Sequence, residues 1–342
     1  MNILPKSSTP RSWGIKGGAL LLAVLFLLLA VTALASICLG SVRVPLREVV
    51  SALFGGEVPW ESQAIILYSR LPRVLAAILV GAALAVSGVV LQSVLGNPLA
   101  GPNIIGVNSG SGLFVLIAAV VWPGRWDVVP LAAFAGALLA CGVIYLLAAS
   151  TGASRITIVL AGVAVSGFFS AGSDAIATLV PDAWTGMSTF LVGGFSGVTM
   201  AGIRFAAWYI LGGLLLALLL SYDMNILALG EETARTLGLS VGRCRLLLIA
   251  AAAVLAGGAV SIGGLLGFGG LIVPHAARFF TGEDNRLLVP AAALLGASFV
   301  LFCDLLSRLL FAPYELPVGI LLNFLGGPFF LWLLLRERRH RR

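Results

Sequence analysis

The chain has 342 residues, of which 60% are hydrophobic and only 10% are charged, and its mean hydropathy is +1.08. Because soluble domains carry about 25% charged residues, this composition excludes a soluble globular protein and predicts an integral membrane protein with several spans. The net charge of +7 does not indicate nucleic-acid binding, since the basic residues lie between apolar runs instead of forming one face.

The first long apolar run, residues 17–39, follows Lys6, Arg11 and Lys16. Signal-peptide cores contain about 7–15 apolar residues, and this run is longer. We therefore expect residues 1–16 to be a cytoplasmic segment and the run to be a retained first span. The following polar stretch, 42–69, is predicted to be a connection containing a short helix over 46–54.

No charged residue occurs between Arg73 and Arg125, and this stretch is too long for one crossing of about 20 residues. Because proline ends helices, the sequence NPLAGP at 97–102 divides the stretch into two spans. With the two apolar runs that follow, the predicted spans two to five are 73–95, 104–122, 130–150 and 156–179.

The next segment, 182–201, is rich in glycine and hydroxyl residues, so we predict a short surface or re-entrant helix there and not a span. Residues 246–277 again lack charge, and the glycines within 263–270 indicate a break between two helices. The predicted spans six to ten are then 203–221, 246–262, 266–280, 287–307 and 317–335.

Ten spans put both termini on the same side of the membrane. With that side in the cytoplasm, 14 Lys and Arg residues lie inside and 7 outside, which accounts for all 21. This bias agrees with the positive-inside rule. The predicted fold is therefore an all-α, polytopic domain over 17–335, followed by a basic cytoplasmic tail, 336–342.

The most highly charged internal segment is 221–245, SYDMNILALGEETARTLGLSVGRCR. Glu231 and Glu232 suit the positive end of a helix dipole, Gly238 suits a helix C-terminus, and Ser240 can cap a following helix. The pattern predicts two short helices with a tight turn between them on one membrane face. The segment alone fits either a docking surface for a soluble partner or a charged connector.

The sequence lacks the motifs of nucleotide-binding and metal-binding proteins. No G-x-x-x-x-G-K-[ST] loop occurs, and the four cysteines have no metal-ligand spacing. His275 follows Pro274 near a helix end, where a structural role is expected. We therefore predict no catalytic group, no metal and no cofactor in this chain, which is not expected to be an enzyme.

Charged residues within or beside the spans are few. Asp174 lies in span five, while Asp304 and Arg308 are four apart on one helix face and are predicted to pair. Arg70 and Arg73 stand outside span two, either as ordinary interface residues or, with Arg308, as an external cluster that can receive carboxylates of a soluble partner. Ion-coupled transporters usually spread acidic residues over several spans, so this pattern disfavours that alternative.

Several stretches together resemble one known family, namely RLPR at 70–73, NPLA at 97–100, IGVNSG at 105–110, LAGV at 160–163, LGEETARTLG at 229–238, GFGGLIVPH at 267–275 and ELPVG at 315–319. In this order they are similar to the membrane permease subunit of the binding-protein-dependent ABC importers for iron–siderophores, haem and cobalamin. The resemblance extends over roughly residues 17–335.

The resemblance implies a ten-span permease of a bacterial cell membrane that works with a second permease copy, identical or homologous. It also implies two cytoplasmic ATPase subunits that carry ATP and Mg²⁺, an external substrate-binding protein, and a metal chelate as substrate, most readily an iron–siderophore. The alternative function is ion-coupled secondary transport. By motif, the implied sites are ATPase coupling at Gly230, Glu231, Glu232, Ala234, Leu237 and Gly238, binding-protein docking at Arg70, Arg73 and Arg308, and a cytoplasmic gate at Asn97 and Leu99.

Overall fold

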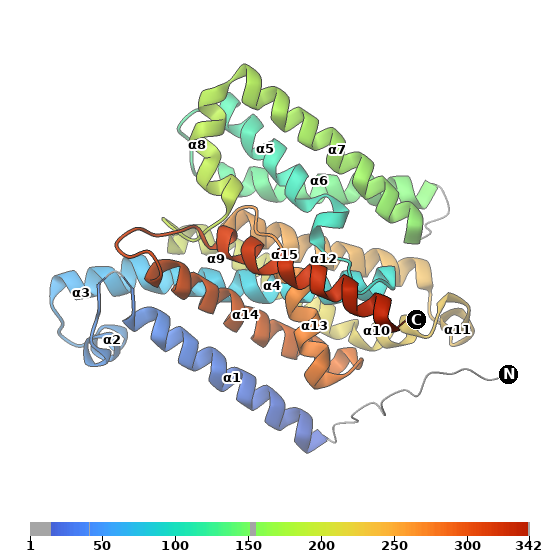
Figure 1. Ribbon diagram of the computed structural model, residues 1–342, viewed down its shortest axis with the longest axis horizontal. Helices are drawn as coiled ribbons and strands as arrows, with labels where there is room; N and C mark the ends of the chain where they lie inside the picture. Colours follow the sequence, from blue (N-terminus) through green and yellow to red (C-terminus); the bar gives the residue numbers. More distant parts are fainter. Residues whose placement is uncertain (1–14, 41, 151–154, 341–342) are drawn as a thin grey trace.

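The computed structural model describes residues 15–40, 42–150 and 155–340, and within these ranges it contains helices and no strand. The helices form a bundle in which the chain runs back and forth between the two ends of the molecule (Figure 1). Their bounds are α1 Ile15–Cys38, α2 Leu46–Leu53, α3 Trp60–Ala64, a π-helical turn Ile65–Arg70, α4 Leu71–Leu95, a 3-10 turn Pro102–Ile105, α5 Val107–Val121, α6 Val129–Ser150, α7 Arg155–Leu179, α8 Pro181–Val192, α9 Met200–Leu219, α10 Ser221–Ala228, α11 Glu231–Thr236, α12 Val241–Gly263, α13 Gly269–Thr281, α14 Asn285–Leu309 and α15 Val318–His340.

Helix α4 is the centre of the bundle and packs against α9, α12, α13 and α14. In the helical run 60–95, 83% of the residues in the most apolar window are buried inside the chain, compared with 17% of those in the corresponding window of α1 and 22% in α7. The rim helices therefore keep most of their apolar surface outside the core, as expected where lipid or another chain is the neighbour.

Glycines bring α4 into backbone contact with its neighbours. A Cβ atom added at Gly88 would lie 1.8 Å from the carbonyl oxygen of Gly270 in α13, and one added at Gly81 would lie 2.3 Å from that of Gly296 in α14. Small residues of this kind allow membrane helices to approach closely. The helices around α4 are therefore held at a separation that no larger side chain permits.

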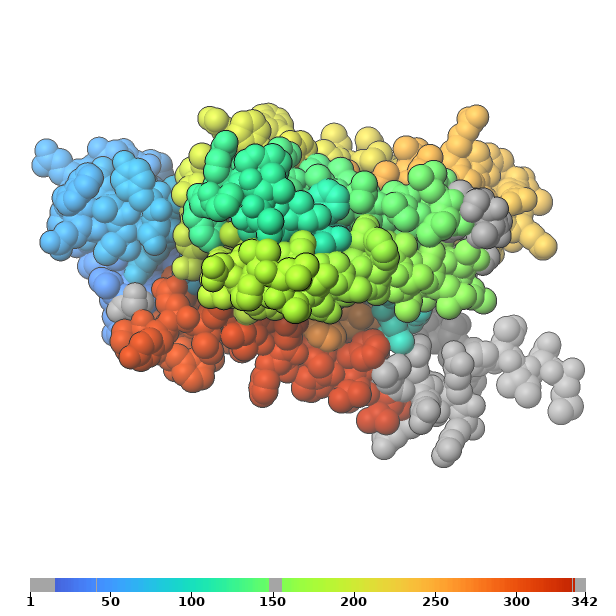
Figure 2. All heavy atoms as spheres, turned by 90° about the horizontal axis from the view of Figure 1, so that it is seen from above, coloured from blue at the N-terminus to red at the C-terminus, as the bar shows by residue number. Residues whose placement is uncertain are grey.

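A second group, α5 to α8, lies beside this core and is joined to it mainly by α6, which packs against α12. Figure 2 looks onto this group, with the C-terminal helices, in red, along its edge. Helix α8 has 12 residues, fewer than the about 20 that a crossing needs, so the prediction that 182–201 holds a short helix and not a span agrees with the structure.

Each predicted span corresponds to a helix, but not every helix is long enough to establish a crossing. Among the described residues, seven helices are long and apolar enough to cross a membrane, while α5 and the 318–333 part of α15 are apolar but shorter. Helix α13 has 13 residues and is about 20 Å long, compared with a hydrocarbon core of about 30 Å. The count of ten crossings remains a prediction.

The connection before α4 differs from the prediction. The short helix α2 lies where one was expected, but residues 60–70, predicted to be a polar connection, are helical and continue directly into α4. The π-helical turn precedes Pro72, which lacks an N–H group and cannot take part in regular helical bonding. Polar residues alone do not distinguish a connection from a helix here, because a helix that projects beyond the apolar core also carries polar residues.

The predicted break between spans seven and eight is confirmed, with α12 ending at Gly263 and α13 beginning at Gly269. Gly264 has φ 71°, and Phe268 is the non-glycine residue with positive φ, 59°, in the described chain. A Cβ atom added at Gly326 in α15 would lie 2.1 Å from the Phe268 ring. The Phe268 side chain therefore rests against the backbone of α15, which holds this strained residue in place.

Candidate functional site

The charged segment 221–245 forms two short helices and the start of a long one. Gly230, with φ 103°, separates α10 from α11, and Gly238, with φ 87°, follows the end of α11. Side chains rarely adopt such angles, so both turns require glycine. One detail of the prediction is wrong: Ser240 makes no side-chain cap, and the helix after it is the long α12, because the second short helix, α10, precedes Gly230.

Helix α11 protrudes from one end of the bundle, beyond α10 (Figure 1). Ala234 is its one buried residue and anchors it, whereas Glu231 and Glu232 are exposed. Leu237 is 59% exposed and Leu229 is 62% exposed. The segment thus exposes large apolar side chains next to the carboxylates of Glu231 and Glu232.

Glu231 ties α11 to the long helix that follows. Its carboxylate lies 2.7 Å from Arg235 Nη2 within α11 and 3.4 Å from Arg245 Nη2 in α12. Desolvation raises the pKa of Glu231, but the charge of Arg245 and the hydrogen bonds from Arg235 and Arg245 outweigh it, and the pKa is lowered from its ordinary value. Glu231 is therefore ionised at neutral pH and links the protruding helix to α12.

The loop after α4 is ordered by its own polar groups. Gly96 is left-handed with φ 56° and ends α4, after which the Asn97 N–H donates to the Gln92 carbonyl oxygen, 3.2 Å away. The Asn97 side-chain oxygen accepts from the Leu99 N–H at 2.9 Å. Leu99 is half-buried and lines a small cavity of about 80 Å³ together with Phe268. The two predicted gate residues are thus joined by a hydrogen bond, and Leu99 faces the break between α12 and α13 across this cavity.

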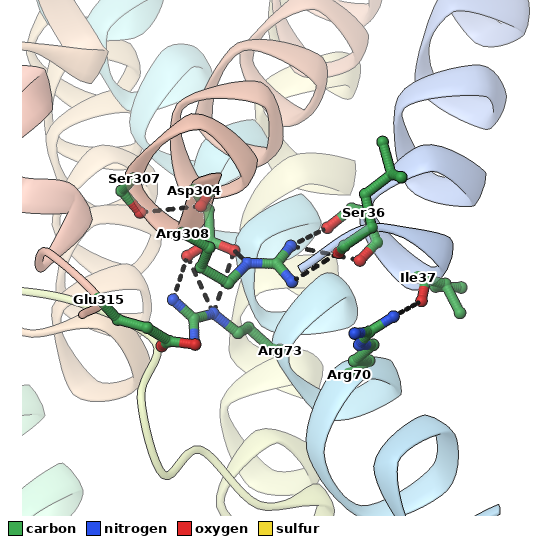
Figure 3. A network of polar contacts seen from close by, with 9 residues as sticks. Ser36, Ile37, Arg70, Arg73, Asp304, Ser307, Arg308 and Glu315 are labelled. Atoms are coloured by element: carbon green, nitrogen blue, oxygen red, sulfur yellow. Dashed lines mark hydrogen bonds and ion pairs between the residues drawn. The ribbon is translucent and has the colours of Figure 1, made fainter. Parts of the chain in front are cut away.

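At the opposite end of the bundle, three arginines and two carboxylates form the network in Figure 3. Arg73 Nε donates to both carboxylate oxygens of Asp304, at 3.0 and 3.1 Å, and its Nη1 lies 2.6 Å from Glu315 Oε2. Arg308 Nε lies 3.2 Å from the second oxygen of Asp304, which confirms the predicted pairing of these two residues. Asp304 is fully buried between two guanidinium groups.

The other contacts of these arginines are with the C-terminal end of α1. Arg70 donates to the carbonyl oxygens of Ile37 and Val42, and Arg308 donates to the Ser36 side chain at 2.6 Å and to the Leu39 carbonyl oxygen at 3.2 Å. Carbonyl groups at a helix C-terminus lack intrahelical partners and attract cations. These arginines therefore fasten α1 to α4 and α14.

The arginine cluster is less accessible than its sequence position suggested. Arg70, Arg73 and Arg308 are 5%, 9% and 3% exposed. Any external carboxylate that reaches them must compete with partners inside the chain, of which Glu315, with a side chain 36% exposed, is the nearest to solvent. Their role in docking stays a prediction.

Sequence reasoning missed the residues whose partners are distant in the chain. Glu315 was noticed only as part of the ELPVG motif, and Ser36 and Gln92 carried no signal. Asp174 is exposed on α7, and His275 Nδ1 lies 3.1 Å from the Leu271 carbonyl oxygen, as a structural histidine does. In the described ranges no three His, Cys, Asp or Glu residues are grouped as metal ligands.

Comparison with known proteins gives consistent matches along the chain. A profile of the FecCD transport family matches residues 27–336. The iron(3+)-hydroxamate import system permease protein FhuB of Bacillus subtilis (strain 168) is 39% identical over 326 residues, covering 94% of this chain and 85% of that protein. The hemin transport system permease protein HmuU of Yersinia pestis is 37% identical over 331 residues, covering 94% and 97%.

A solved structure of a metal-chelate type ABC transporter in an inward-facing conformation has the same fold. It superposes with a TM-score of 0.82 at 31% identity, covering 93% of this chain and 99% of the solved one. The family match spans most of the chain and includes α4, the 97–102 loop and the 221–245 segment, which confirms the resemblance seen in the sequence. The chain belongs to the FecCD transport family.

Proposed function

We propose that this chain is the membrane-spanning subunit through which a bacterial ABC importer moves a metal chelate into the cytoplasm. The observation that carries the proposal is the family match over residues 27–336, together with two import permeases that are 37% and 39% identical and covered over 97% and 85% of their length. The chain crosses the membrane ten times over 17–335, with both termini and the basic tail 336–342 in the cytoplasm.

The energy source in this proposal is a pair of ATP-binding subunits that bind ATP and Mg²⁺ on their own chains. They dock on the surface made by Gly230, Glu231, Glu232, Leu237 and Gly238, with Ala234 as its buried anchor. Support comes from the protrusion of α11, its exposed acidic and apolar side chains, and the link from Glu231 to Arg245. Movement of the ATPase subunits is passed into the bundle through this contact.

The transport path lies between two copies of the permease, and its cytoplasmic end is closed at Asn97 and Leu99. The loop that holds these residues follows the central helix α4, so any tilt of α4 moves the loop. On the outer face, Arg70, Arg73 and Arg308 receive the carboxylates of a substrate-binding protein. The partly exposed Glu315 is the internal carboxylate that such a partner displaces.

Ferric hydroxamate is the first substrate to test, because the relative with 39% identity is named for it; ferric citrate and haem follow from other relatives. The test is uptake into vesicles that contain the permease and its ATPase, with the binding protein supplied outside. Uptake that requires internal ATP and the binding protein supports the proposal. Uptake driven by a proton or sodium gradient without nucleotide would instead establish secondary transport.

A further inference from the structure

We propose that Asn225 is a positioning residue that passes movement of the ATPase-docking helix α11 to the cytoplasmic end of α4. The inference rests on the proposed function, since it assumes that α11 receives the ATPase. It concerns a group of polar contacts, the Asn225 junction, formed by Tyr222 and Asn225 of α10, Asp284, Asn285 and Arg286 at the start of α14, and Ser93 of α4.

Asn225 uses both ends of its amide. Its Nδ2 donates to Asp284 Oδ1 at 2.8 Å, and its Oδ1 accepts from the Asn285 N–H at 2.9 Å and from Asn285 Nδ2 at 2.8 Å. Three hydrogen bonds from one side chain fix both its position and its orientation. Asn225 therefore holds α10 rigidly against the first turn of α14.

A second contact on the same side of α10 strengthens this attachment. The Arg286 guanidinium lies 4.6 Å from the centre of the Tyr222 ring, which is a cation–π distance. Asp284 also accepts from the Arg286 N–H at 3.0 Å and so caps α14 while it binds Asn225. Because α10 is attached to α14 at two positions, α10 and the first turn of α14 are expected to move together.

From α14 the contacts continue to the last turn of α4. Asn285 is 4% exposed, and its Oδ1 lies 3.4 Å from Ser93 Oγ. Arg278 of α13 donates to the Gln92 side-chain oxygen, and the Gln92 carbonyl oxygen accepts from the Asn97 N–H. The Asn225 junction is thus separated from the Asn97–Leu99 loop by one turn of α4.

Gln92, in the last turn of α4, is a buried residue whose side chain is hydrogen-bonded, among the described residues, at one end only. The side chain is 3% exposed, and within the described chain its Nε2 has no hydrogen-bond partner. A buried donor without a partner is destabilising, whereas the carboxamide oxygen accepts a hydrogen bond from Arg278. A shift of α4 relative to α13 or α14 that supplies an acceptor to Nε2 would be favoured for this reason, and we expect a movement arriving through α14 to act on this turn.

The contacts of Asn225 with α14 are separate from the ion pair that joins α11 to α12. Glu231 joins α11 to α12 through Arg245, while Asn225 joins α10 to α14 and α4. A loss at Asn225 therefore leaves the Glu231 contact in place. Variants of Asn225 can therefore change the coupling of ATP hydrolysis to transport without changing docking of the ATPase subunits.

The test compares variants in vesicles that contain the whole transporter and its binding protein, with ferric hydroxamate, or the chelate chosen by the uptake comparison, as probe. Asn225→Asp places two carboxylates face to face, and Asn225→Asp combined with Asp284→Asn restores one donor and one acceptor. The matched control is Asp223→Asn, which changes one charge on the same helix without removing any of the three hydrogen bonds of Asn225. Uptake per ATP hydrolysed and retention of the ATPase subunits are measured for each.

We expect Asn225→Asp to retain the ATPase subunits but to lower uptake per ATP about tenfold, the double variant to recover most of it, and Asp223→Asn to match the wild type. Wild-type coupling in Asn225→Asp, or no recovery in the double variant, overturns the inference. If Asn225→Asp does not assemble, Tyr222→Leu replaces it, and unchanged uptake per ATP there also overturns the inference. Wild-type vesicles that need no ATP would overturn the proposed function itself, before any variant is compared.

Discussion

Arg73 and Asp304, 231 residues apart in the chain, form a buried ion pair in which Arg73 Nε donates to both carboxylate oxygens at 3.0 and 3.1 Å. The same carboxylate lies 3.2 Å from Arg308 Nε. A single fully buried acid thus balances two guanidinium groups, and it joins α4 to α14 at the end of the bundle where α1 also terminates. Removal of its charge leaves Arg308, which is 3% exposed, without a carboxylate and leaves Arg73 with Glu315 as its one acidic partner in the described chain.

We therefore expect Asp304→Asn to destabilise the folded chain by about 3–5 kcal/mol, because it removes the carboxylate that pairs with the buried Arg308 and leaves Arg73 with Glu315 alone. The measurement is the thermal unfolding midpoint and the yield of purified protein. Asp127→Asn is the matched control, since Asp127 pairs with Arg125 at 2.6 Å with both side chains at least 60% exposed, and its loss should cost about 0–1 kcal/mol. Equal midpoints for the two variants would contradict the importance of the buried pair.

Glu315 gives a way to test docking without breaking the buried network. Its carboxylate lies 2.6 Å from Arg73 Nη1, and its side chain is 36% exposed. Glu315→Gln removes the more exposed of the two carboxylates that hold Arg73 and leaves Asp304 in place, so the affinity for the binding protein should rise, by about threefold to tenfold. Binding of the purified binding protein to the permease in nanodiscs measures this.

The control for the Glu315 test is Glu61→Gln, which removes an exposed acid from α3 at the same end of the bundle (Figure 1). Its effect on affinity should be small. An affinity for the binding protein that stays unchanged or falls in Glu315→Gln would remove Arg73 from the docking surface and leave it a purely structural residue.

The sequence predicted the helices well because the signals for them are local. Helices are marked by charge-free runs, and their breaks by the prolines of 97–102 and the glycines of 263–270. Each of these signals determines the backbone conformation of nearby residues only. The helix at 60–70 was missed because its polar residues are locally indistinguishable from those of a connection, although the helix continues into α4.

The contacts of the site residues were predicted less well, because partners far apart in the chain leave no local pattern. An arginine at a membrane boundary looks the same in sequence whether it points to water or, as Arg70 does, to the carbonyl groups at the end of α1. Asn225 likewise is an ordinary polar residue in a charged segment until α14 places Asp284 and Asn285 against it. The pairing of Asp304 with Arg308 was predictable only because four residues separate them on one helix.

The close contact of α4 with α13 predicts a sharp difference between two glycine substitutions. Gly88→Ala places a methyl group 1.8 Å from the Gly270 carbonyl oxygen, so the two backbones must separate and folding or transport should be lost. Gly142→Ala in α6 meets nothing within 4 Å and should be neutral or stabilising by up to about 1 kcal/mol. Thermal unfolding of both variants checks this, and a normal midpoint for Gly88→Ala would show that α4 and α13 are not in backbone contact.

The link from Glu231 to Arg245 predicts a dependence of α11 on pH. Since the pKa of Glu231 is lowered in the folded chain, its contribution is present above the unfolded pKa and is lost as pH falls through the folded one. Glu231→Gln should remove the contribution at every pH and lower the hydrogen-exchange protection factors of the α11 amides. The wild type should approach the variant only in acid.

Glu232→Gln is the control, because the acid next to Glu231 has no ion pair within 4 Å in the described chain. Equal protection in wild type and Glu231→Gln at neutral pH would show that the ion pair does not hold α11, and that Ala234 alone anchors it.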